Sequence, residues 1–296
     1  MKNSLGRLVT VTAALAAAAG CSPPSMLNAL NAVTPGESGV GRVARAVPFT
    51  DEATALDIWV SDDVRDGGTS APVLVFFYGG GWADGERGEY GFVARAYAAR
   101  GFVVVVPDYR KVPDVRFPAF LEDGAAAIRW TRSHIERYGG DPDRIVLAGH
   151  SAGAYIAVQL ALDPHYLHIE RVPDDTIKAV AALSGPYDFY PFTSERAEAA
   201  FGDWPEPAAT QPVSFARADA PPLWLATGTD DQTVRPRNSE RLAAAQQAAG
   251  SMTTELQLYP DLSHADPVKA LSKPFRGTAP VLEDSIAFFE RHGITP

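Results

Sequence analysis

The chain has 296 residues, of which 46% are hydrophobic and 21% charged, so it is long enough to bury one large core or two small ones. Its 36 acidic residues outnumber the 26 lysines and arginines, and the formal charge of -10 without any basic run argues against nucleic acid as a partner. The single cysteine excludes an internal disulfide and a cysteine-based zinc site within one copy of the chain.

The first 20 residues are typical of an export signal. Lys2 and Arg7 supply the positive charge that precedes the apolar stretch of such signals. The stretch itself, Leu8–Ala19, is too short to span a bilayer comfortably. We therefore expect residues 1–20 to be cleaved off rather than folded.

The lone cysteine, Cys21, lies where the cleavage would occur. Ala18-Ala19-Gly20-Cys21 resembles a bacterial lipobox, in which the cysteine is acylated and becomes the mature N-terminus. We expect residues 21–46 to form a flexible, lipidated tether that holds the protein in the bacterial cell envelope, with no other contact to the membrane. The alternatives are an ordinary signal peptide, or a buried cysteine in an uncleaved chain.

From residue 47 to the C-terminus, strand and helix patterns alternate without a repeat, which predicts a single catalytic domain over 47–296. The expected strands are Leu56–Val60, Pro72–Tyr78, Gly101–Pro107, Ile145–Ala148, Ile177–Leu183, Pro222–Thr227 and Thr253–Tyr259. The expected helices are Tyr90–Arg100, Leu121–Tyr138, Ala154–Leu162, Ser239–Ala249 and Leu282–His292. Buried strands separated by helices predict an α/β fold, with a mainly parallel central sheet covered by helices on both faces. Chemistry is then expected at the carboxyl ends of the strands.

One segment, residues 186–221, breaks this alternation. It is long, aromatic and rich in proline, with a short helical pattern near Ser194–Ala200. We interpret it as a small cap over the site rather than as a second domain. Its aromatic side chains, together with Trp82, must either pack against the core or line a pocket, and those that line it predict a small, apolar, partly gated pocket. These cap residues are Tyr187, Phe189, Tyr190, Phe192, Phe201 and Trp204.

The most informative motif is Gly149-His150-Ser151-Ala152-Gly153, which has the G-x-S-x-G pattern. It lies between a buried strand and an alanine-rich helix, the setting in which a tight turn lifts a serine hydroxyl out of a sheet. Ser151 is therefore the candidate nucleophile. A serine in a merely structural turn is the alternative.

A serine nucleophile needs a base and an acid that orients the base, and in this architecture they follow in the order Ser, acid, His. Asp231 follows the Pro222–Thr227 strand in a Gly-x-x-Asp-x-x-Val loop, and His264 follows the Thr253–Tyr259 strand. We prefer Asp231 to its neighbour Asp230 because the spacing of that loop fits it. Asp188 and Asp266 are the reserve candidates.

The oxyanion of an acyl-transfer reaction needs backbone N–H donors. Ala152 would supply one, and Gly80 and Gly81 would supply the others, since they stand in a run of three glycines at the end of a buried strand. The alternative is a plain flexible turn.

A second group, His165, His168 and Glu170, superficially resembles a set of metal ligands. Its position just after a predicted helix indicates a solvated turn instead. We expect neither a metal ion nor an organic cofactor.

Several motifs, taken in order, resemble the carboxylesterases of the α/β-hydrolase fold, nearest to the hormone-sensitive-lipase-like and bacterial feruloyl-esterase-like branches, with kynurenine formamidases as relatives. The motifs are Tyr78–Trp82, Asp108–Arg110, Phe117-Pro118 with Asp123, Gly149–Gly153, Ser184–Asp188 and the loops of Asp231 and His264. The resemblance covers about Val47 to the C-terminus. It implies structural roles for Asp108, Arg110 and Asp123. The chain departs from those families at Tyr78, where they usually carry a histidine that shapes the oxyanion loop.

These observations favour an exported serine hydrolase that cleaves small carboxylic esters through an acyl-enzyme, with a Ser151-Asp231-His264 triad. An amidohydrolase of the arylformamidase type would use the same residues, but its usual cytosolic substrate fits an exported chain poorly. A non-catalytic binding protein on this fold would be expected to lack Ser151 or His264. The sequence does not set the oligomeric state.

Overall fold

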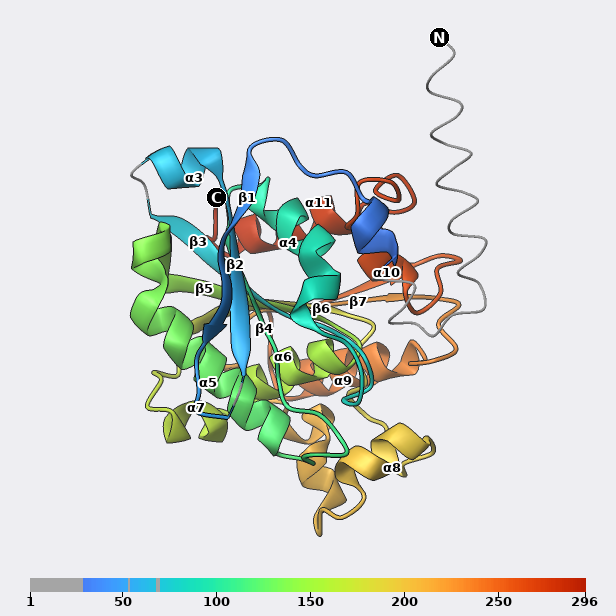
Figure 1. Cartoon of the computed structure of the whole chain (residues 1–296). Helices are drawn as coiled ribbons and strands as arrows, with labels where there is room; N and C mark the ends of the chain where they lie inside the picture. The colour runs from blue at the N-terminus through green and yellow to red at the C-terminus, as the bar shows by residue number, and fades with distance from the viewer. Residues whose placement is uncertain (1–28, 53, 68–69) are drawn as a thin grey trace.

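The computed structural model describes residues 29–52, 54–67 and 70–296. Figure 1 shows the chain running from the blue N-terminal strands to the red C-terminal helix. The predicted export signal and the candidate lipidation residue Cys21 lie outside the described residues. No helix in these ranges is long and apolar enough to cross a bilayer.

The strands and helices follow one another along the chain as the alternating pattern predicts. The strands are β1 (Val40–Pro48), β2 (Ala55–Ser61), β3 (Ala71–Phe77), β4 (Val103–Pro107), β5 (Gly140–His150), β6 (Ile177–Leu183), β7 (Leu223–Gly228) and β8 (Thr254–Tyr259). The helices are α3 (Asp62–Gly67), α4 (Gly91–Ala98), α5 (Ala119–His134), α6 (Ala152–Leu162), α7 (His165–Ile169), α8 (Glu195–Phe201), α9 (Arg237–Ala248), α10 (Asp266–Lys269) and α11 (Val281–Arg291).

The eight strands of the described residues form one sheet in the order β1-β2-β4-β3-β5-β6-β7-β8. The pairings of β2 with β1 and with β4 are antiparallel, and every other pairing is parallel. Strands β3, β4 and β7 are buried along their whole length, which is why their sequences are nearly continuous apolar runs rather than alternating ones.

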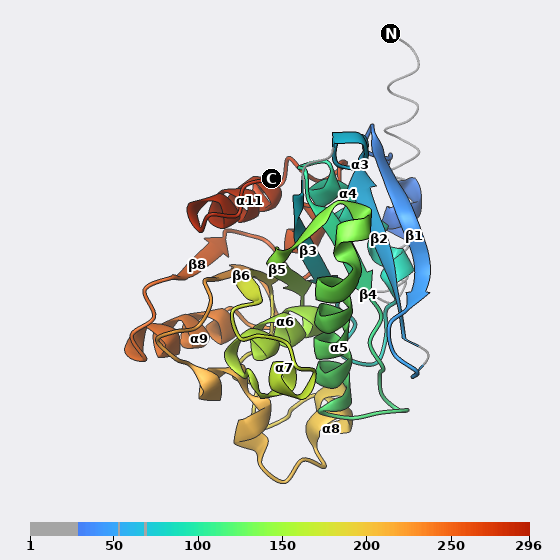
Figure 2. The same cartoon turned by 90° about the vertical axis from the view of Figure 1, so that its left-hand side faces the viewer.

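Helices cover both faces of this sheet, as predicted. Figure 2 shows α4 and α11 on one side of the strands and α5, α6 and α9 on the other. The phenol of Tyr97 in α4 is hydrogen bonded to Ser285 in α11 at 2.9 Å, which ties the two helices of the first face together. Because the central strands are parallel, their carboxyl ends lie at a single edge of the sheet, where ligands bind in open α/β sheets.

The predicted boundary between tether and domain at residue 46 is wrong. Residues 29–33 are helical, and Leu30 is buried against the domain. Glu37 forms an ion pair with Arg276 at 2.8 Å, and β1 pairs with β2 at the edge of the sheet. The pattern of β1 concealed it, because its residues are exposed or only partly buried and the strand carries no apolar run.

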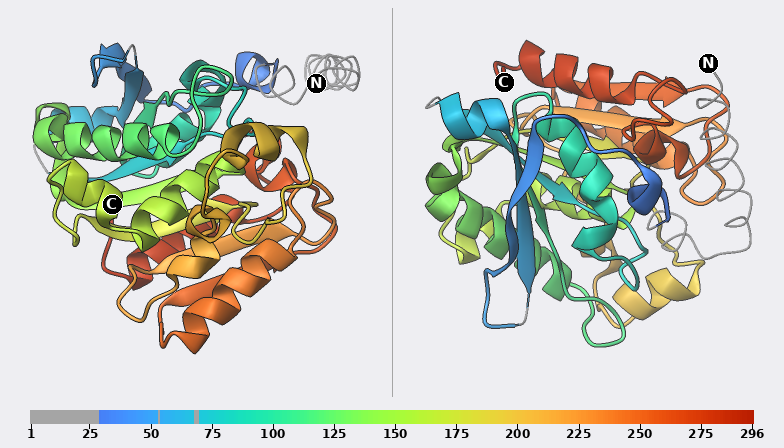
Figure 3. Two further views of the ribbon diagram at one scale, coloured as in Figure 1. Left: turned by 90° about the horizontal axis from the view of Figure 1, so that it is seen from below. Right: turned by 45° about the horizontal axis from the view of Figure 1, so that its top comes forward.

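The segment 186–221 stands out from the sheet edge, as expected of a cap. Its helix α8 is drawn in gold at the bottom of Figure 1, and the view from below in Figure 3 places the gold segment in front of the strands. Buried residues hold it in place, since Phe201 is 1% exposed and its backbone neighbour Ala200 accepts a hydrogen bond from the N–H of Phe117. The cap is thus anchored to the body by its own apolar side chains.

Candidate active site

Ser151 stands at the sharp turn between β5 and α6. Its backbone has φ 55° and ψ -121°, a strained conformation for a residue other than glycine. The turn requires glycine on both sides. A Cβ on Gly149 would lie 2.4 Å from the carbonyl oxygen of Gly153, and a Cβ on Gly153 would lie 2.0 Å from the carbonyl oxygen of Phe77. Close packing therefore explains the glycines of the G-x-S-x-G pattern, and the strained turn presents the serine hydroxyl at the sheet edge.

The structure brings the three predicted triad residues into one chain of hydrogen bonds. The Ser151 Oγ lies 2.9 Å from His264 Nε2, and His264 Nδ1 lies 2.7 Å from Asp231 Oδ2. The serine follows β5, the aspartate follows β7 and the histidine follows β8. The three residues are far apart in sequence, and they meet because these strands end at the same edge of the sheet. In this arrangement, the imidazole can take the hydroxyl proton while the carboxylate fixes its tautomer.

Asp231, rather than Asp230, is the acid that contacts the histidine. The side chain of Asp231 is fully buried, and its Oδ1 accepts hydrogen bonds from the N–H groups of Thr233 and Val234 at 2.9 and 2.8 Å. Backbone donors satisfy the oxygen that faces away from His264, so the carboxylate is held in one orientation. Asp230 is exposed.

The two reserve acids are engaged elsewhere. Asp188 pairs with Arg241 at 2.6 Å. Asp266 accepts hydrogen bonds from the Ser263 N–H and from Lys269 Nζ, at 2.8 and 2.9 Å. Neither has a hydrogen bond to His264 within the described part of the chain.

A second histidine, His150, contacts the backbone of His264. Its Nε2 lies 3.0 Å from the carbonyl oxygen of His264, which can only accept, so the His150 ring donates there. Burial, with a smaller effect from His264, lowers the pKa of His150 to about 3, which keeps the ring neutral. The Gly149–Gly153 motif gives no sign of this role, which depends on the contact between His150 and the backbone of His264.

The candidate donors to the oxyanion lie beside the sharp turn that carries Ser151. Gly80 and Gly81 both have positive φ, at 140° and 60°, and a Cβ on Gly80 would lie 2.1 Å from the carbonyl oxygen of Asp84. Within the described ranges, the N–H groups of these two glycines have no hydrogen-bond acceptor. The N–H of Ala152 is in the first turn of α6, where it has no partner inside the helix. All three remain free for a ligand.

Tyr78, the departure from the resembling families, is part of a buried network that holds this loop. Its hydroxyl donates to Asp108 Oδ1 at 2.8 Å and accepts from Lys111 Nζ at 2.9 Å. The Tyr109 hydroxyl donates to the Tyr78 carbonyl at 2.9 Å. Burial raises the pKa of Tyr78 well above its usual value, so the phenol keeps its proton. A tyrosine and a lysine thus anchor the strand end that leads into the glycines.

Asp108 also joins this loop to the edge of the sheet. It accepts a hydrogen bond from the Arg87 N–H at 2.9 Å and forms an ion pair with the Arg87 guanidinium. That guanidinium also contacts Asp57 in β2 at 3.0 Å. The arrangement is consistent with the structural role that the resemblance implies for Asp108.

The hollow that contains Ser151 has a volume of about 650 Å³ and a mixed lining. Its aromatic members are Trp82, Phe189 and Tyr190. Its charged members are Arg196, Arg235, Arg237, Arg241 and Asp188. The prediction of an apolar pocket is therefore wrong, because arginines from the cap, from the loop that follows Asp231 and from α9 line it.

The other aromatic residues of the cap serve as its core rather than as pocket lining. Tyr187 and Phe201 are buried, and Phe201 packs edge-on against Trp82 with ring centroids 4.8 Å apart. Phe192 stacks on Phe201 at 5.7 Å, and Trp204 lies edge-on against Phe117 at 4.8 Å. A cap must bury apolar area to stay attached, and these residues do so.

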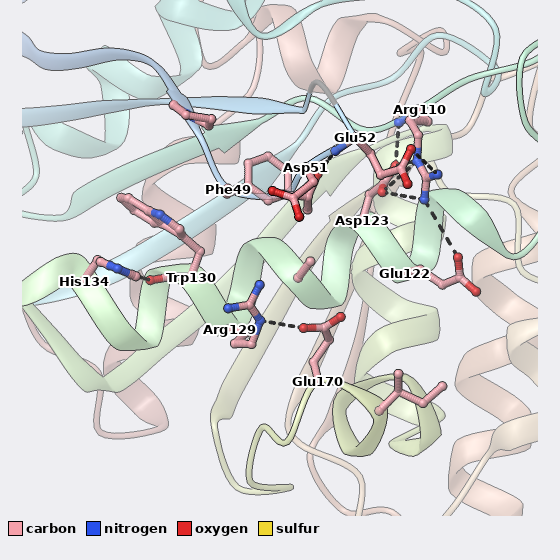
Figure 4. Close-up of a pocket in the computed structure, with 14 residues that line it drawn as sticks. Phe49, Asp51, Glu52, Arg110, Glu122, Asp123, Arg129, Trp130, His134 and Glu170 are labelled. Atoms are coloured by element: carbon pink, nitrogen blue, oxygen red, sulfur yellow. Dashed lines mark hydrogen bonds and ion pairs between the residues drawn. The ribbon is translucent and has the colours of Figure 1, made fainter.

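A second hollow, of about 640 Å³, lies against α5 and away from the triad. Figure 4 shows that its guanidiniums face carboxylates. Arg110 contacts Asp123 at 2.9 Å, and Arg129 contacts Glu170. The positions of Arg110 and the buried Asp123 agree with the structural role that the resemblance implies for them.

His165, His168 and Glu170, which superficially resemble a set of metal ligands, do not form a common site. His165 faces Asp163, and His168 faces Asp174. Glu170 is paired with Arg129. Across residues 29–52, 54–67 and 70–296, no cluster of three or more potential ligands is present.

Comparison with known proteins shows which family model and which relatives match this chain. Residues 56–245 match the family model described as BD-FAE. The chain is 32% identical to the esterase LipQ of Mycobacterium tuberculosis over 71% of this chain and 53% of that protein. It is 29% identical to the isoprenylcysteine alpha-carbonyl methylesterase ICME of Arabidopsis thaliana over 83% of this chain and 61% of that protein. The chain thus spans about half to three fifths of the length of these relatives.

Solved structures show the same fold. Esterase 2 of Thermogutta terrifontis, phosphonylated by sarin, superposes with a TM-score of 0.71 at 23% identity, covering 88% of this chain and 98% of that one. Esterase B of Lactobacillus rhamnosis superposes with a TM-score of 0.78 at 20% identity, covering 97% of both chains. The fold of this chain is therefore the α/β-hydrolase fold.

Proposed function

This chain belongs to the BD-FAE family of α/β-hydrolase fold proteins, and we propose that it is a serine esterase that cleaves small carboxylic esters through an acyl-enzyme. The observation that carries the proposal is the unbroken hydrogen-bond chain from Ser151 through His264 to the buried Asp231. It lies beside free N–H groups and opens into a hollow large enough for a small ester.

In the proposed reaction, the Ser151 hydroxyl attacks the ester carbonyl carbon while His264 Nε2 takes the hydroxyl proton. The negative charge that develops on the carbonyl oxygen is bound by the N–H groups of Ala152, Gly80 and Gly81. The tetrahedral intermediate then expels the alcohol, which leaves with the proton from His264. Water, activated by the same imidazole, attacks the acyl-enzyme, and the acid is released as Ser151 recovers its proton.

The direct test is Ser151→Ala, assayed with short-chain 4-nitrophenyl esters. We expect kcat to fall by about 10⁴-fold or more, because Ser151 carries the only hydroxyl that is hydrogen bonded to the His264 imidazole among the described residues. Ser133→Ala, on the exposed side of α5, is the matched control and should keep full activity. Hydrolysis by the Ser151 variant at a rate near that of the native protein would overturn the proposal. Hydrolysis of N-formylkynurenine in preference to every ester would assign an arylformamidase instead.

We further propose that the enzyme acts in a bacterial cell envelope, anchored by a lipid on Cys21. The lipobox-like sequence supports this location. Because residues 29–33 already pack on the domain through Leu30, an anchor at Cys21 would hold the domain close to the membrane surface. Cys21→Ser should release the protein from the membrane fraction or leave the signal uncleaved. Unchanged processing and unchanged membrane attachment would contradict this location.

A further inference from the structure

The wall of the Ser151 hollow has an excess of positive charge, in a chain whose formal charge is -10. Four arginines line it against a single aspartate. Two of the four are neutralised locally. Arg196 contacts Asp84 and donates to the Gly80 carbonyl at 2.8 Å, and Arg241 pairs with Asp188 at 2.6 Å.

The other two, Arg235 and Arg237, face the same hollow and are exposed to solvent. Neither forms an ion pair with any carboxylate in the part of the chain that the structure describes. Exposed arginines elsewhere in the described part of the chain are of both kinds: Arg116 pairs with Asp203 and Arg291 with Glu255, whereas Arg171 is exposed and has no ion pair. What distinguishes Arg235 and Arg237 is that they are unpaired and also line the hollow of the nucleophile.

The segment that carries these arginines is fixed in place. Asn238 is buried, its side chain donates to the Arg235 carbonyl at 3.2 Å, and its Oδ1 accepts from the N–H groups of Tyr187 and Asp188, each at 3.0 Å. The Asn238 amide therefore joins the loop that follows Asp231, the start of α9 and the start of the cap. Arg235 and Arg237 consequently extend from a rigid base, which reduces the entropy lost when they bind a ligand.

We propose that the substrate is a carboxylic ester that also carries an anionic group, and that Arg235 and Arg237 bind this anion while Ser151 attacks the ester. The inference rests on the proposed ester hydrolysis. A guanidinium matches a carboxylate through two parallel hydrogen bonds, and the positive wall attracts anions before contact. Trp82, Phe189 and Tyr190 would receive the apolar part of the same molecule.

The test compares matched ester pairs that differ in one charge. Mono-4-nitrophenyl adipate against 4-nitrophenyl hexanoate places the anion in the acid half of the ester. 4-Acetoxybenzoate against 4-acetoxybenzamide places it in the alcohol half. For each pair, the ratio of kcat/KM for the anionic ester to that for the neutral one is divided by the ratio of their hydroxide-catalysed rates. We expect this corrected ratio to exceed one for at least one pair, and added sodium chloride to reduce it.

The variants assign that preference to the two side chains. Each of Arg235→Gln and Arg237→Gln should lower the corrected ratio by about tenfold, and the double variant by about 100-fold, since tenfold corresponds to one modest charge-assisted contact. The matched control is Arg100→Gln, which removes the same charge at the opposite edge of the sheet, where Arg100 pairs with Glu283. It should leave the ratio unchanged.

The two ways to fail are separable. If the native protein hydrolyses neutral esters through Ser151 but the ratio is at or below one for both pairs, or is the same in the double variant, the anion proposal is wrong and the esterase proposal stands. If no ester of either kind is hydrolysed, the esterase proposal fails and the substrate inference fails with it.

Discussion

The two hollows are of similar volume and both are lined by arginines, but they satisfy their charges differently. Beside α5, Arg110 is held by Asp123 and Arg129 by Glu170 (Figure 4). At the triad, Asp231 and His264 are paired with each other, whereas Arg235 and Arg237 have no carboxylate partner among the described residues. The arginines named in the first hollow are thus neutralised within the protein, while the second has two whose charge no described carboxylate neutralises.

Among the substitutions considered next, the largest loss of activity is expected at Asp231, the acid of the triad. Asp231→Asn should lower kcat by about 10³-fold or more, because an amide next to Nδ1 favours the wrong imidazole tautomer. Asp230→Asn, the matched control one residue away and exposed, should change kcat by no more than about threefold. Equal losses in steady-state kinetics would mean that the hydrogen bond to His264 does not orient the base.

A smaller effect is expected from Tyr78→Phe, which removes the hydroxyl between Asp108 and Lys111. The change leaves the partly buried Lys111 cation short of one acceptor and loosens the strand end before the oxyanion glycines. We expect kcat to fall about tenfold with KM nearly constant, since donors to the oxyanion act in the transition state. Tyr97→Phe loses a comparable buried contact, to Ser285, far from the site and should retain native kcat. A KM effect without a kcat effect would place Tyr78 in substrate binding instead.

The smallest effect on catalysis is expected in the other hollow. Arg110→Gln removes the guanidinium that pairs with the buried Asp123 and should lower the free energy of unfolding by about 2 kcal/mol, measured by urea denaturation. Its kcat/KM should stay within about twofold of native, because the hollow is away from Ser151. A catalytic loss larger than the loss of stability explains would show that this hollow also serves the reaction.

Much of the fold and the core of the site could be predicted from the sequence. Apolar runs such as Val103–Val106 identify buried strands, and the glycines around Ser151 follow from a turn that excludes any Cβ. The chain order of serine, acid and histidine, together with the spacing of the Gly-x-x-Asp-x-x-Val loop, favours Asp231 and His264. These features are local or depend only on the order of elements.

The missed features depend on contacts between distant segments. The edge strand β1 has no apolar run, so only its pairing with β2 reveals it. Lys111 reaches Tyr78 from 33 residues away, and His150 reaches His264 from 114 residues away. The arginines of the pocket could not be placed from the sequence, because it does not show which side of a loop faces a cavity. The run Val234-Arg-Pro-Arg237, directly after the predicted acid, could have suggested a charged wall.

Covalent trapping of the nucleophile shows directly whether Ser151 attacks the substrate. The native protein is treated with an alkyl 4-nitrophenyl phosphonate, and the adduct is located by intact mass and peptide mass spectrometry. We predict one phosphonyl group per chain, on the Ser151 hydroxyl, with loss of hydrolysis in proportion to labelling and no label in Ser151→Ala. A native protein that hydrolyses esters but takes no label, or that is labelled at another residue, would contradict the account.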